Sequence, residues 1–370
     1  MAARGHSSSA SAWRLVRAWQ RGRRGLASTN AAVSGPPQPL QQQQQRVRTV
    51  LGTMSIPHQL DLDDTVRALE VFREAGHVEV DTAIMYEDGK TEKTLGEAGL
   101  CGANHFKVAA KANPWFKDGR THGNEPVGGL RADRVKEQLR LSLTNLRADS
   151  VDLFYLHAPD HDTPLEETLL AVYHLSQEGV FNEWGLSNFA AWEVAHAWNM
   201  CRQNGWPTPS VYQGMYNPLT RAVEPELLPC LRSLGMRFYA FNPLAGGILS
   251  GKYKFDQAAT TGRYAEGTVM GSRYRERFWH EEIFDALDVL KGICAAHGTT
   301  LPKASLGWLY HHSELSGEHA DAVIVCGSSL EQIKSNMEVS VSTEPLPQEL
   351  ADGFEAAWEA CRGRCPPYFR

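Results

Sequence analysis

Four side chains with the chemistry of a proton-donating site stand at or near the ends of three short apolar runs. Asp81 closes the first run and Tyr86 follows in the adjoining loop, while Lys111 and His157 close the next two runs. A tyrosine hydroxyl has an ordinary pKa near 10 and is a weak acid at neutral pH. A lysine ammonium beside it favours the phenolate, so we expect Lys111 to lower the pKa of Tyr86.

The other two residues have supporting roles in this arrangement. Asp81 would hold Lys111 charged and in place, and His157 could donate a hydrogen bond to a substrate oxygen or share its proton with the tyrosine. Taken singly, each residue has a simpler explanation: an aspartate that caps a loop, a surface lysine, a histidine in the core. Taken together, at the ends of successive strands, they predict an acid that protonates a carbonyl oxygen.

The elements that would position these residues alternate between strand and helix, with a repeat of about forty residues. Apolar, β-branched runs predict eight strands, at residues 47–51, 78–83, 106–111, 151–157, 183–187, 211–216, 237–242 and 322–326. Amphipathic patterns predict helices at residues 64–75, 91–99, 133–146, 165–178, 191–203, 224–234, 278–297 and 303–312, and from residue 329 onward.

Eight strand-helix units match a closed (β/α)8 TIM barrel in a single domain, whose usual size is about 250 residues plus insertions. An open doubly wound sheet is the alternative, but that fold usually carries G-x-G-x-x-G after its first strand. The corresponding segment, Leu51-Gly-Thr-Met54, has one glycine. The sequence therefore favours the barrel, whose active site lies at the carboxyl ends of the strands.

The composition limits the partners that the chain can have. Its net charge of −6 gives no electrostatic attraction to nucleic acid. No apolar run reaches the roughly 18 residues that a membrane span requires, so we expect no membrane segment. The seven cysteines lack CxxC spacing, which predicts reduced thiols, and we expect no metal site. The expected partners are small molecules.

Residues 1–45 have the composition of a mitochondrial transit peptide followed by a linker. The first 60 residues contain no Asp or Glu, and arginines recur at helical spacing from Arg14 to Arg24. Presequences are amphipathic, rich in Arg and Ser, and poor in acids. The alternative is a basic tail without an address, on a cytoplasmic protein. Residues 46–370 would form the barrel domain in either case.

Seven short motifs lie in order between residues 47 and 370: Asp81-Thr-Ala-Ile-Met-Tyr86, Lys111-Ala-Asn-Pro-Trp115, Phe154-Tyr-Leu-His-Ala-Pro-Asp160, Gly185-Leu-Ser-Asn-Phe189, Val211-Tyr-Gln-Gly-Met-Tyr-Asn217, Asn242-Pro-Leu-Ala-Gly-Gly247 and Tyr368-Phe-Arg370. Together they resemble the aldo-keto reductase superfamily, and within it the aflatoxin B1 aldehyde reductases of family 7. The resemblance implies that Asp81, Tyr86, Lys111 and His157 form the catalytic tetrad, with Tyr86 as general acid. It also implies NADPH as the hydride donor.

The resemblance further implies where NADPH or NADP would bind. Ser187, Asn188 and Gln213 would grip the carboxamide of the nicotinamide ring, and Phe241 would stack on that ring. The glycine-rich loop 242–252 would cover the pyrophosphate, because its backbone N–H groups can approach phosphate closely. The implied cofactor residues are Met54, Asp81, Ser187, Asn188, Gln213, Phe241, Asn242, Pro243, Leu244, Ala245, Gly246, Gly247, Ile248, Leu249, Ser250, Gly251, Lys252, Arg263, Ser328, Ser329, Gln332 and Asn336.

Two hydroxyl residues, Ser328 and Ser329, precede the last predicted helix and resemble the pocket for the adenosine 2′-phosphate, since a helix N-terminus attracts anions. The sequence departs here from the wider superfamily, which often has a Lys-Ser pair before this helix and an Arg where Gln332 stands. The preference for NADPH therefore depends on the two serines together with Lys334 and Arg263.

The resemblance implies an NADPH-dependent aldehyde reductase that acts on carboxylated aldehydes such as succinic semialdehyde, on dicarbonyls and on aflatoxin B1 dialdehyde. His157, Tyr274, Arg277 and Arg370 would bind the substrate, with the arginines holding its carboxylate. A solvated basic cluster around a surface helix is the alternative for those arginines.

Two other functions remain open, and so does the oligomeric state. One is a cofactor-binding regulatory subunit of the potassium-channel β type, and the other is a barrel lyase or isomerase that uses no cofactor. Members of this branch resemble homodimers, so we expect a homodimer.

Overall fold

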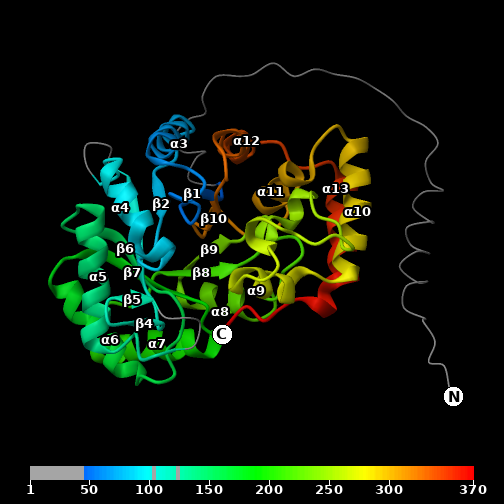
Figure 1. Cartoon of the computed structure of the whole chain (residues 1–370). Helices are drawn as coiled ribbons and strands as arrows, with labels where there is room; N and C mark the ends of the chain where they lie inside the picture. The colour runs from blue at the N-terminus through cyan, green and yellow to red at the C-terminus, as the bar shows by residue number, and fades with distance from the viewer. Residues whose placement is uncertain (1–45, 102–105, 122–125) are drawn as a thin grey trace. The chain divides into compact units, whose positions relative to one another are not determined.

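Eight parallel strands close into a barrel in the computed structural model, which describes residues 46–101, 106–121 and 126–370 (Figure 1). The order around the barrel is β1-β10-β9-β8-β7-β6-β3-β2, and β1 pairs with β2 on one side and β10 on the other. The strands are β1 (Arg48–Gly52), β2 (Glu79–Asp81), β3 (Lys107–Ala112), β6 (Val151–Leu156), β7 (Phe181–Ser187), β8 (Val211–Met215), β9 (Arg237–Phe241) and β10 (Ala322–Val325). The predicted TIM barrel is confirmed, and all eight strands fall within the predicted segments or within two residues of them.

Helices cover the outside of the barrel and follow the strands as predicted. The predicted helices are α3 (Leu62–Glu74), α4 (Lys90–Glu97), α5 (Ala132–Leu146), α6 (Leu165–Gln177), α7 (Ala191–Asn204), α8 (Leu227–Leu234), α10 (Glu281–Ala296), α11 (Leu301–His311) and α12 (Leu330–Val341). The proposed transit peptide and linker, residues 1–45, lie outside the described residues.

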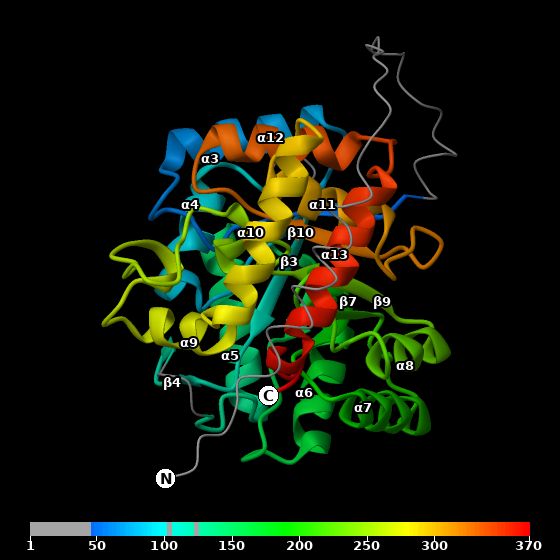
Figure 2. The same cartoon turned by 90° about the vertical axis from the view of Figure 1, so that its right-hand side faces the viewer.

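Several elements were not predicted from the sequence pattern. They are the helices α9 (Val269–Phe278) and α13 (Gln348–Cys361), the hairpin β4 (Phe116–Lys117) with β5 (Arg120–Thr121), and the 3-10 turns η1 (Tyr86–Gly89), η2 (Ala245–Ser250), η3 (Gly262–Tyr264) and η4 (Arg362–Arg364). Helix α13 packs along α10 (Figure 2). It thereby returns the end of the chain towards the barrel.

The apolar core has two parts because each strand faces both the barrel interior and the surrounding helices. The large part lies between the strands and the helices. The smaller part fills the interior and consists of Val50, Ala109, Leu153, Tyr155, Val211, Tyr239, Ala322 and Ile324. These layers of side chains make the barrel a packed scaffold, so the strand ends are held in fixed positions.

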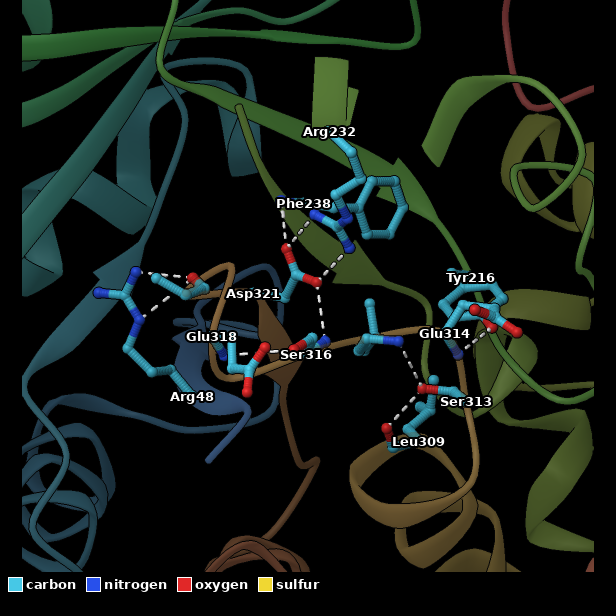
Figure 3. A network of polar contacts seen from close by, with 12 residues as sticks. Arg48, Tyr216, Arg232, Phe238, Leu309, Ser313, Glu314, Ser316, Glu318 and Asp321 are labelled. Carbon is cyan, nitrogen blue, oxygen red and sulfur yellow. Dashed lines mark hydrogen bonds and ion pairs between the residues drawn. The ribbon is translucent and has the colours of Figure 1, made fainter. Parts of the chain in front are cut away.

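A polar network anchors the amino-terminal ends of β9 and β10 (Figure 3). Asp321, which is fully buried, accepts two hydrogen bonds from the guanidinium of Arg232 on α8, at 2.9 and 2.5 Å. The same carboxylate accepts hydrogen bonds from the backbone N–H groups of Phe238 and Ser316. A buried charge requires this number of partners to offset its loss of hydration. The network lies at the end of the barrel opposite the carboxyl ends of the strands.

In the described ranges, no helix is long and apolar enough to cross a membrane. Within the same ranges, no group of three or more His, Cys, Asp or Glu side chains could hold a metal ion. All seven cysteines are free thiols.

His77, between α3 and β2, makes the fold sensitive to acid. Its ring nitrogen Nε2 lies 2.8 Å from the Ser340 hydroxyl on α12, which packs beside α3 (Figure 1). Burial, followed by the charge of Arg46, lowers the pKa of His77 to about 4. Between pH 6.5 and 4 the unfolded chain binds a proton that the folded protein does not, so stability falls as the pH falls through this range.

We expect the wild-type protein to lose up to about 3 kcal/mol of unfolding free energy between pH 6.5 and 4 through this residue. His77→Gln should remove that part of the acid sensitivity, as measured by urea unfolding at several pH values. His58→Gln, which changes an exposed histidine, should leave the wild-type pH profile in place. Parallel profiles for all three proteins would contradict the assignment to His77.

Candidate active site

A buried ion pair joins the two strands that carry Asp81 and Lys111. The Lys111 ammonium donates to the Asp81 carboxylate at 2.6 Å and to the Thr82 carbonyl oxygen at 2.7 Å. Lys111 is 1% exposed and Asp81 is 3% exposed. Strands β2 and β3 are neighbours, with Asp81 opposite Ala109, so the pairing register brings the two side chains together at the barrel mouth. The predicted contact between Asp81 and Lys111 is confirmed.

Tyr86 lies against this pair at the start of the turn η1. Its hydroxyl oxygen is 3.5 Å from the Lys111 nitrogen, which also lies 5.1 Å from the centre of the Tyr86 ring. The proximity of Tyr86 and Lys111 is therefore as predicted.

The predicted direction of the pKa change at Tyr86 is wrong. Burial, and after it the charge of Asp81, raises the pKa of Tyr86 well above its ordinary value, while burial lowers the pKa of Lys111. The physical reason is that burial costs the phenolate its hydration, and that Asp81 both offsets the lysine charge and disfavours a second anion. Tyr86 is thus held in its protonated form.

His157 follows β6 and completes the group. Its ring meets the Tyr86 ring edge-on, with 6.1 Å between the ring centres. Burial and the charges of Lys111 and Arg370 hold the pKa of His157 well below its ordinary value, so the imidazole is neutral. In the part of the chain that the structure describes, its Nδ1 atom is buried without a hydrogen-bond partner.

The residues predicted to grip a nicotinamide carboxamide lie at the same rim. Asn188, with φ of 62°, donates to the His157 carbonyl oxygen at 2.8 Å and to the Ser187 hydroxyl at 2.9 Å. Gln213 in β8 donates to Asp81 at 2.7 Å. This last contact was not foreseen from the sequence, and it ties the tetrad to the proposed cofactor residues.

The loop after β9 has an unusual backbone conformation. Positive φ angles occur at Asn242, Ala245, Gly246 and Gly247. A Cβ atom on Gly246 would lie 2.3 Å from the Tyr274 ring, so no larger residue fits there. Tyr264 fixes the loop by donating to the Ala245 carbonyl oxygen at 2.5 Å. The N–H groups of Ala245, Gly247 and Gly251 donate to carbonyl oxygens of the same loop, so these bonds also hold the loop in one conformation.

The N-terminus of α12 is preorganised by its own side chains. Ser329 caps the helix by accepting from the Gln332 N–H. The Gln332 side-chain oxygen accepts from the Ser328 N–H at 2.9 Å and from the Ser328 hydroxyl at 3.0 Å. Asn336 donates to the Cys326 carbonyl oxygen at 3.1 Å. Ser328 and Gln332 are exposed, so a ligand can reach this end of the helix.

Arg263 lies between the α12 end and the catalytic rim. Its guanidinium is 3.4 Å from both the Asn242 side-chain oxygen and the Tyr274 hydroxyl, and 4.0 Å from the Cys326 sulfur. It is also close enough to Tyr86 to oppose the rise in the pKa of that hydroxyl. The sequence predicted that Arg263 would help to bind the 2′-phosphate. The structure places it closer to the catalytic centre than that prediction implied.

The remaining residues predicted to bind the cofactor lie after β1, at the end of β9 and in the loop that follows β9. Met54 follows β1, Phe241 ends β9 against the interior core, and the Lys252 ammonium lies 5.0 Å from the Tyr253 ring centre. The other loop residues are Pro243, Leu244, Ile248, Leu249, Ser250 and Gly251.

The last residue of the chain lies at the catalytic rim. The Arg370 N–H donates to the Asn188 carbonyl oxygen at 3.0 Å, and its guanidinium lies 5.2 Å from the Trp115 ring centre. The Trp115 ring is in turn 6.1 Å from the His157 ring. Tyr368 anchors this tail through a hydrogen bond to Glu226.

Arginines from two distant segments meet here. Although Arg370 keeps part of its surface open to solvent, burial by the surrounding chain and the charges of Arg277 and Arg273 lower the pKa of Arg370 to about 10. Tyr274, on the same helix α9, donates to Asn242 at 3.2 Å. The structure therefore brings the predicted substrate residues Tyr274, Arg277 and Arg370 to the mouth that contains His157.

Two site residues were not predicted from the sequence. Trp115 lies between His157 and Arg370. Its position just after β3 could have predicted a place at the rim. Cys326 directly follows β10 and contacts Arg263. The other rim residues also lie at or just after the carboxyl ends of their strands, so this position was the available signal.

Comparisons with known proteins agree with this geometry. The sequence model described as the Aldo/keto reductase family matches residues 48–359. The chain belongs to the aldo/keto reductase family. It is 48% identical to aflatoxin B1 aldehyde reductase member 2 of Homo sapiens over 349 residues, which is 92% of each chain. It is 47% identical to aflatoxin B1 aldehyde reductase member 4 of Homo sapiens, over 88% of this chain and 97% of that protein. As an aldo/keto reductase, the protein is an oxidoreductase, and the predicted resemblance is confirmed.

Proposed function

We propose that this aldo/keto reductase reduces aldehydes to alcohols with NADPH. The observation that carries the proposal is the buried Asp81–Lys111 pair placed against a protonated Tyr86 and a neutral His157 at one barrel mouth. Relatives named as aflatoxin B1 aldehyde reductases support the same reaction class.

The residues present fit a nicotinamide cofactor. Glycine at position 246, where a Cβ atom would meet the Tyr274 ring, suits the close approach of a pyrophosphate to this loop, and the Asn188 and Gln213 amides suit a carboxamide. When bound, the cofactor supplies a hydride to the carbonyl carbon. Ser328, Ser329, Lys334 and Arg263 favour the phosphorylated form of the cofactor.

The protein's own part is to deliver a proton to the carbonyl oxygen. Tyr86 donates its hydroxyl proton as negative charge develops on that oxygen, and its raised pKa keeps the proton in place until then. Lys111 lies 3.5 Å away and stabilises the phenolate that remains. His157, which is neutral and lies beside Tyr86, orients the carbonyl oxygen towards that hydroxyl.

Absorbance at the NADPH band tests the function directly. We expect NADPH to be consumed in the presence of an aldehyde and NADH to be consumed more slowly. Cofactor binding without turnover on any aldehyde would favour the regulatory function of the potassium-channel β type. Absence of binding would favour a lyase or isomerase.

The arginine cluster at the mouth suggests aldehydes that carry a carboxylate, such as succinic semialdehyde, alongside dicarbonyls and aflatoxin B1 dialdehyde. If Arg277 binds the carboxylate, Arg277→Met should raise KM for succinic semialdehyde roughly ten- to hundred-fold, the effect of losing one charge-assisted hydrogen bond. Steady-state kinetics with a charged and an uncharged aldehyde provide the measurement.

The control is an uncharged aldehyde, 4-nitrobenzaldehyde, whose KM should stay within about two-fold of the wild-type value. Equal losses on both aldehydes would mean that Arg277 supports the fold of the insertion rather than recognition of the acid. Arg362→Met, which changes an exposed arginine on the turn η4, should affect neither substrate.

We also propose that residues 1–45 direct the protein to mitochondria. Deleting them should leave kcat and the thermal midpoint unchanged, because their composition is not suited to packing. A fluorescent fusion of this segment alone should accumulate in mitochondria. A diffuse cytosolic signal would contradict the targeting proposal and favour a cytoplasmic protein.

A homodimer remains the proposed assembly. Light scattering of the purified protein measures its mass in solution.

A further inference from the structure

The Trp115 side chain contacts both the catalytic group and the end of the chain. Its ring meets the His157 ring edge-on, with 6.1 Å between the ring centres and 68° between the ring planes. The guanidinium carbon of Arg370 lies over the same indole, 5.2 Å from the ring centre. Trp115 is 4% exposed, so the indole presents little surface to water. A cation over a tryptophan ring is held more firmly when the contact is shielded from water.

Buried hydrogen bonds fix the loop that carries Trp115. The Trp115 N–H donates to the Asn113 side-chain oxygen at 3.1 Å, and the Asn113 side chain donates to Gln138 on α5 at 3.1 Å. Asn113 and Gln138 are both fully buried. A Cβ atom on Gly129 would lie 2.6 Å from the Pro114 carbonyl oxygen, so a second segment packs closely on this loop. The position of the indole is therefore set by the core.

The backbone of the carboxyl-terminal tail is held at two points. The Tyr368 hydroxyl donates to Glu226 at 2.8 Å and accepts from the Ala191 N–H at 3.1 Å. The Arg370 N–H donates to the Asn188 carbonyl oxygen at 3.0 Å. These bonds place the start of the Arg370 side chain but not its guanidinium. Ordering so long a side chain opposes ligand binding unless another contact already holds it.

The charges around Arg370 do not supply such a contact. Burial, followed by the charges of Arg277 and Arg273, lowers the pKa of Arg370 to about 10, so the guanidinium remains protonated at neutral pH. Two neighbouring cations repel it. An aromatic face attracts a guanidinium without neutralising it, and the charge stays available to an anion. Trp115 provides that face.

We infer that Trp115 is a positioning residue, which holds the Arg370 guanidinium in the mouth to receive the carboxylate of an acidic aldehyde. The inference rests on the proposed function, in which the aldehyde carbonyl lies beside His157. Because the indole contacts both His157 and Arg370, it sets the separation between the carbonyl and the carboxylate of the substrate. Trp115 acts through Arg370 and takes no part in proton transfer. It should therefore govern the choice between charged and uncharged aldehydes.

Steady-state kinetics with two aldehydes test this role. The measured quantity is kcat/KM for succinic semialdehyde divided by kcat/KM for 4-nitrobenzaldehyde, because unfolded protein and any disturbance of His157 lower both values. We expect Trp115→Leu to lower this ratio about three- to ten-fold, mainly through KM for succinic semialdehyde, as one cation–π contact is lost. Trp115→Phe keeps an aromatic face and should lower the ratio less.

Trp198→Leu is the matched control. It removes a contact of the same kind, in which the Arg202 guanidinium lies 5.5 Å from the Trp198 ring centre within α7. The ratio should stay at the wild-type value in this variant. An unchanged ratio in Trp115→Leu as well would overturn the inference and leave the proposed function standing.

The Arg370→Met background shows whether Trp115 acts through that arginine. There, Trp115→Leu should cause no further fall in the ratio, because the guanidinium that the indole holds is already gone. Falls that multiply in the double variant would mean that Trp115 contacts the substrate directly. That result would overturn the positioning role and leave the reductase function standing.

Release of the last residue tests the contact without any turnover. Carboxypeptidase B removes a carboxyl-terminal arginine, and it can do so only when the end of the chain leaves the mouth. We expect mass spectrometry to show Arg370 released at least about three-fold faster from Trp115→Leu than from the wild-type protein or Trp198→Leu. Equal rates would overturn the inference. No oxidation of NADPH by the wild-type protein with any aldehyde would instead overturn the proposed function, whatever the release rates.

Discussion

Tyr86→Phe is expected to lower kcat at least about a hundred-fold, the lower end of what a general acid contributes. Phenylalanine keeps the ring that packs edge-on against His157 and removes only the proton 3.5 Å from Lys111. The dissociation constant for NADPH should therefore stay close to the wild-type value. Fluorescence titration and steady-state kinetics on the same preparation measure both quantities.

A matched control separates loss of the acid from loss of any tyrosine hydroxyl. Tyr173→Phe changes a half-buried residue of α6 that stacks on Trp206, and kcat should remain at the wild-type level. If Tyr86→Phe retained most of the wild-type turnover, Tyr86 would not be the general acid. His157 would then be the remaining candidate for the proton donor.

Lys111→Met is expected to reduce the unfolding free energy by about 3–5 kcal/mol, because it leaves a buried carboxylate without its counter-ion. Asp81 would keep its bond from Gln213 but lose the 2.6 Å contact with the ammonium. Turnover should fall as well, since the Tyr86 phenolate would have no adjacent cation. Urea unfolding and steady-state kinetics measure the two losses.

The double variant Asp81→Asn with Lys111→Met separates stability from catalysis. Removing both charges should recover much of the lost stability, because no buried charge remains, but it should not recover turnover. Lys107→Met, at the exposed start of the same strand, should change neither quantity strongly. If Lys111→Met were as stable as Lys107→Met, the ion pair would not contribute to the fold as described.

The sequence was sufficient for the order of strands and for the position of the tetrad along them. Buried parallel strands are continuous apolar runs, so an ionisable residue at the end of a run, such as Asp81 or His157, is conspicuous. Closing the barrel brings all the carboxyl ends to one rim, and this makes residues far apart in sequence neighbours.

Elements that stabilise one another across long separations were missed. Helix α13 packs on α10, and its tail places Arg370 beside Asn188. Helix α9 lies in the insertion after β9, where no strand-helix repeat marks a boundary. The motif containing Arg370 was visible in the sequence, but its distance from His157 depends on how α13 docks.

By itself, the sequence determined the barrel, the family and the residue types at the rim, because those follow from local periodicity and short motifs. Only the tertiary structure decided how the residues behave. Tyr86 has a raised pKa instead of a lowered one because its protonation depends on burial and on Asp81 as well as on Lys111. The hydrogen bond from Gln213 to Asp81 likewise forms only when barrel closure brings β8 and β2 to one mouth. Electrostatic energy depends on three-dimensional distance and solvent access, and neither is encoded in spacing along the chain.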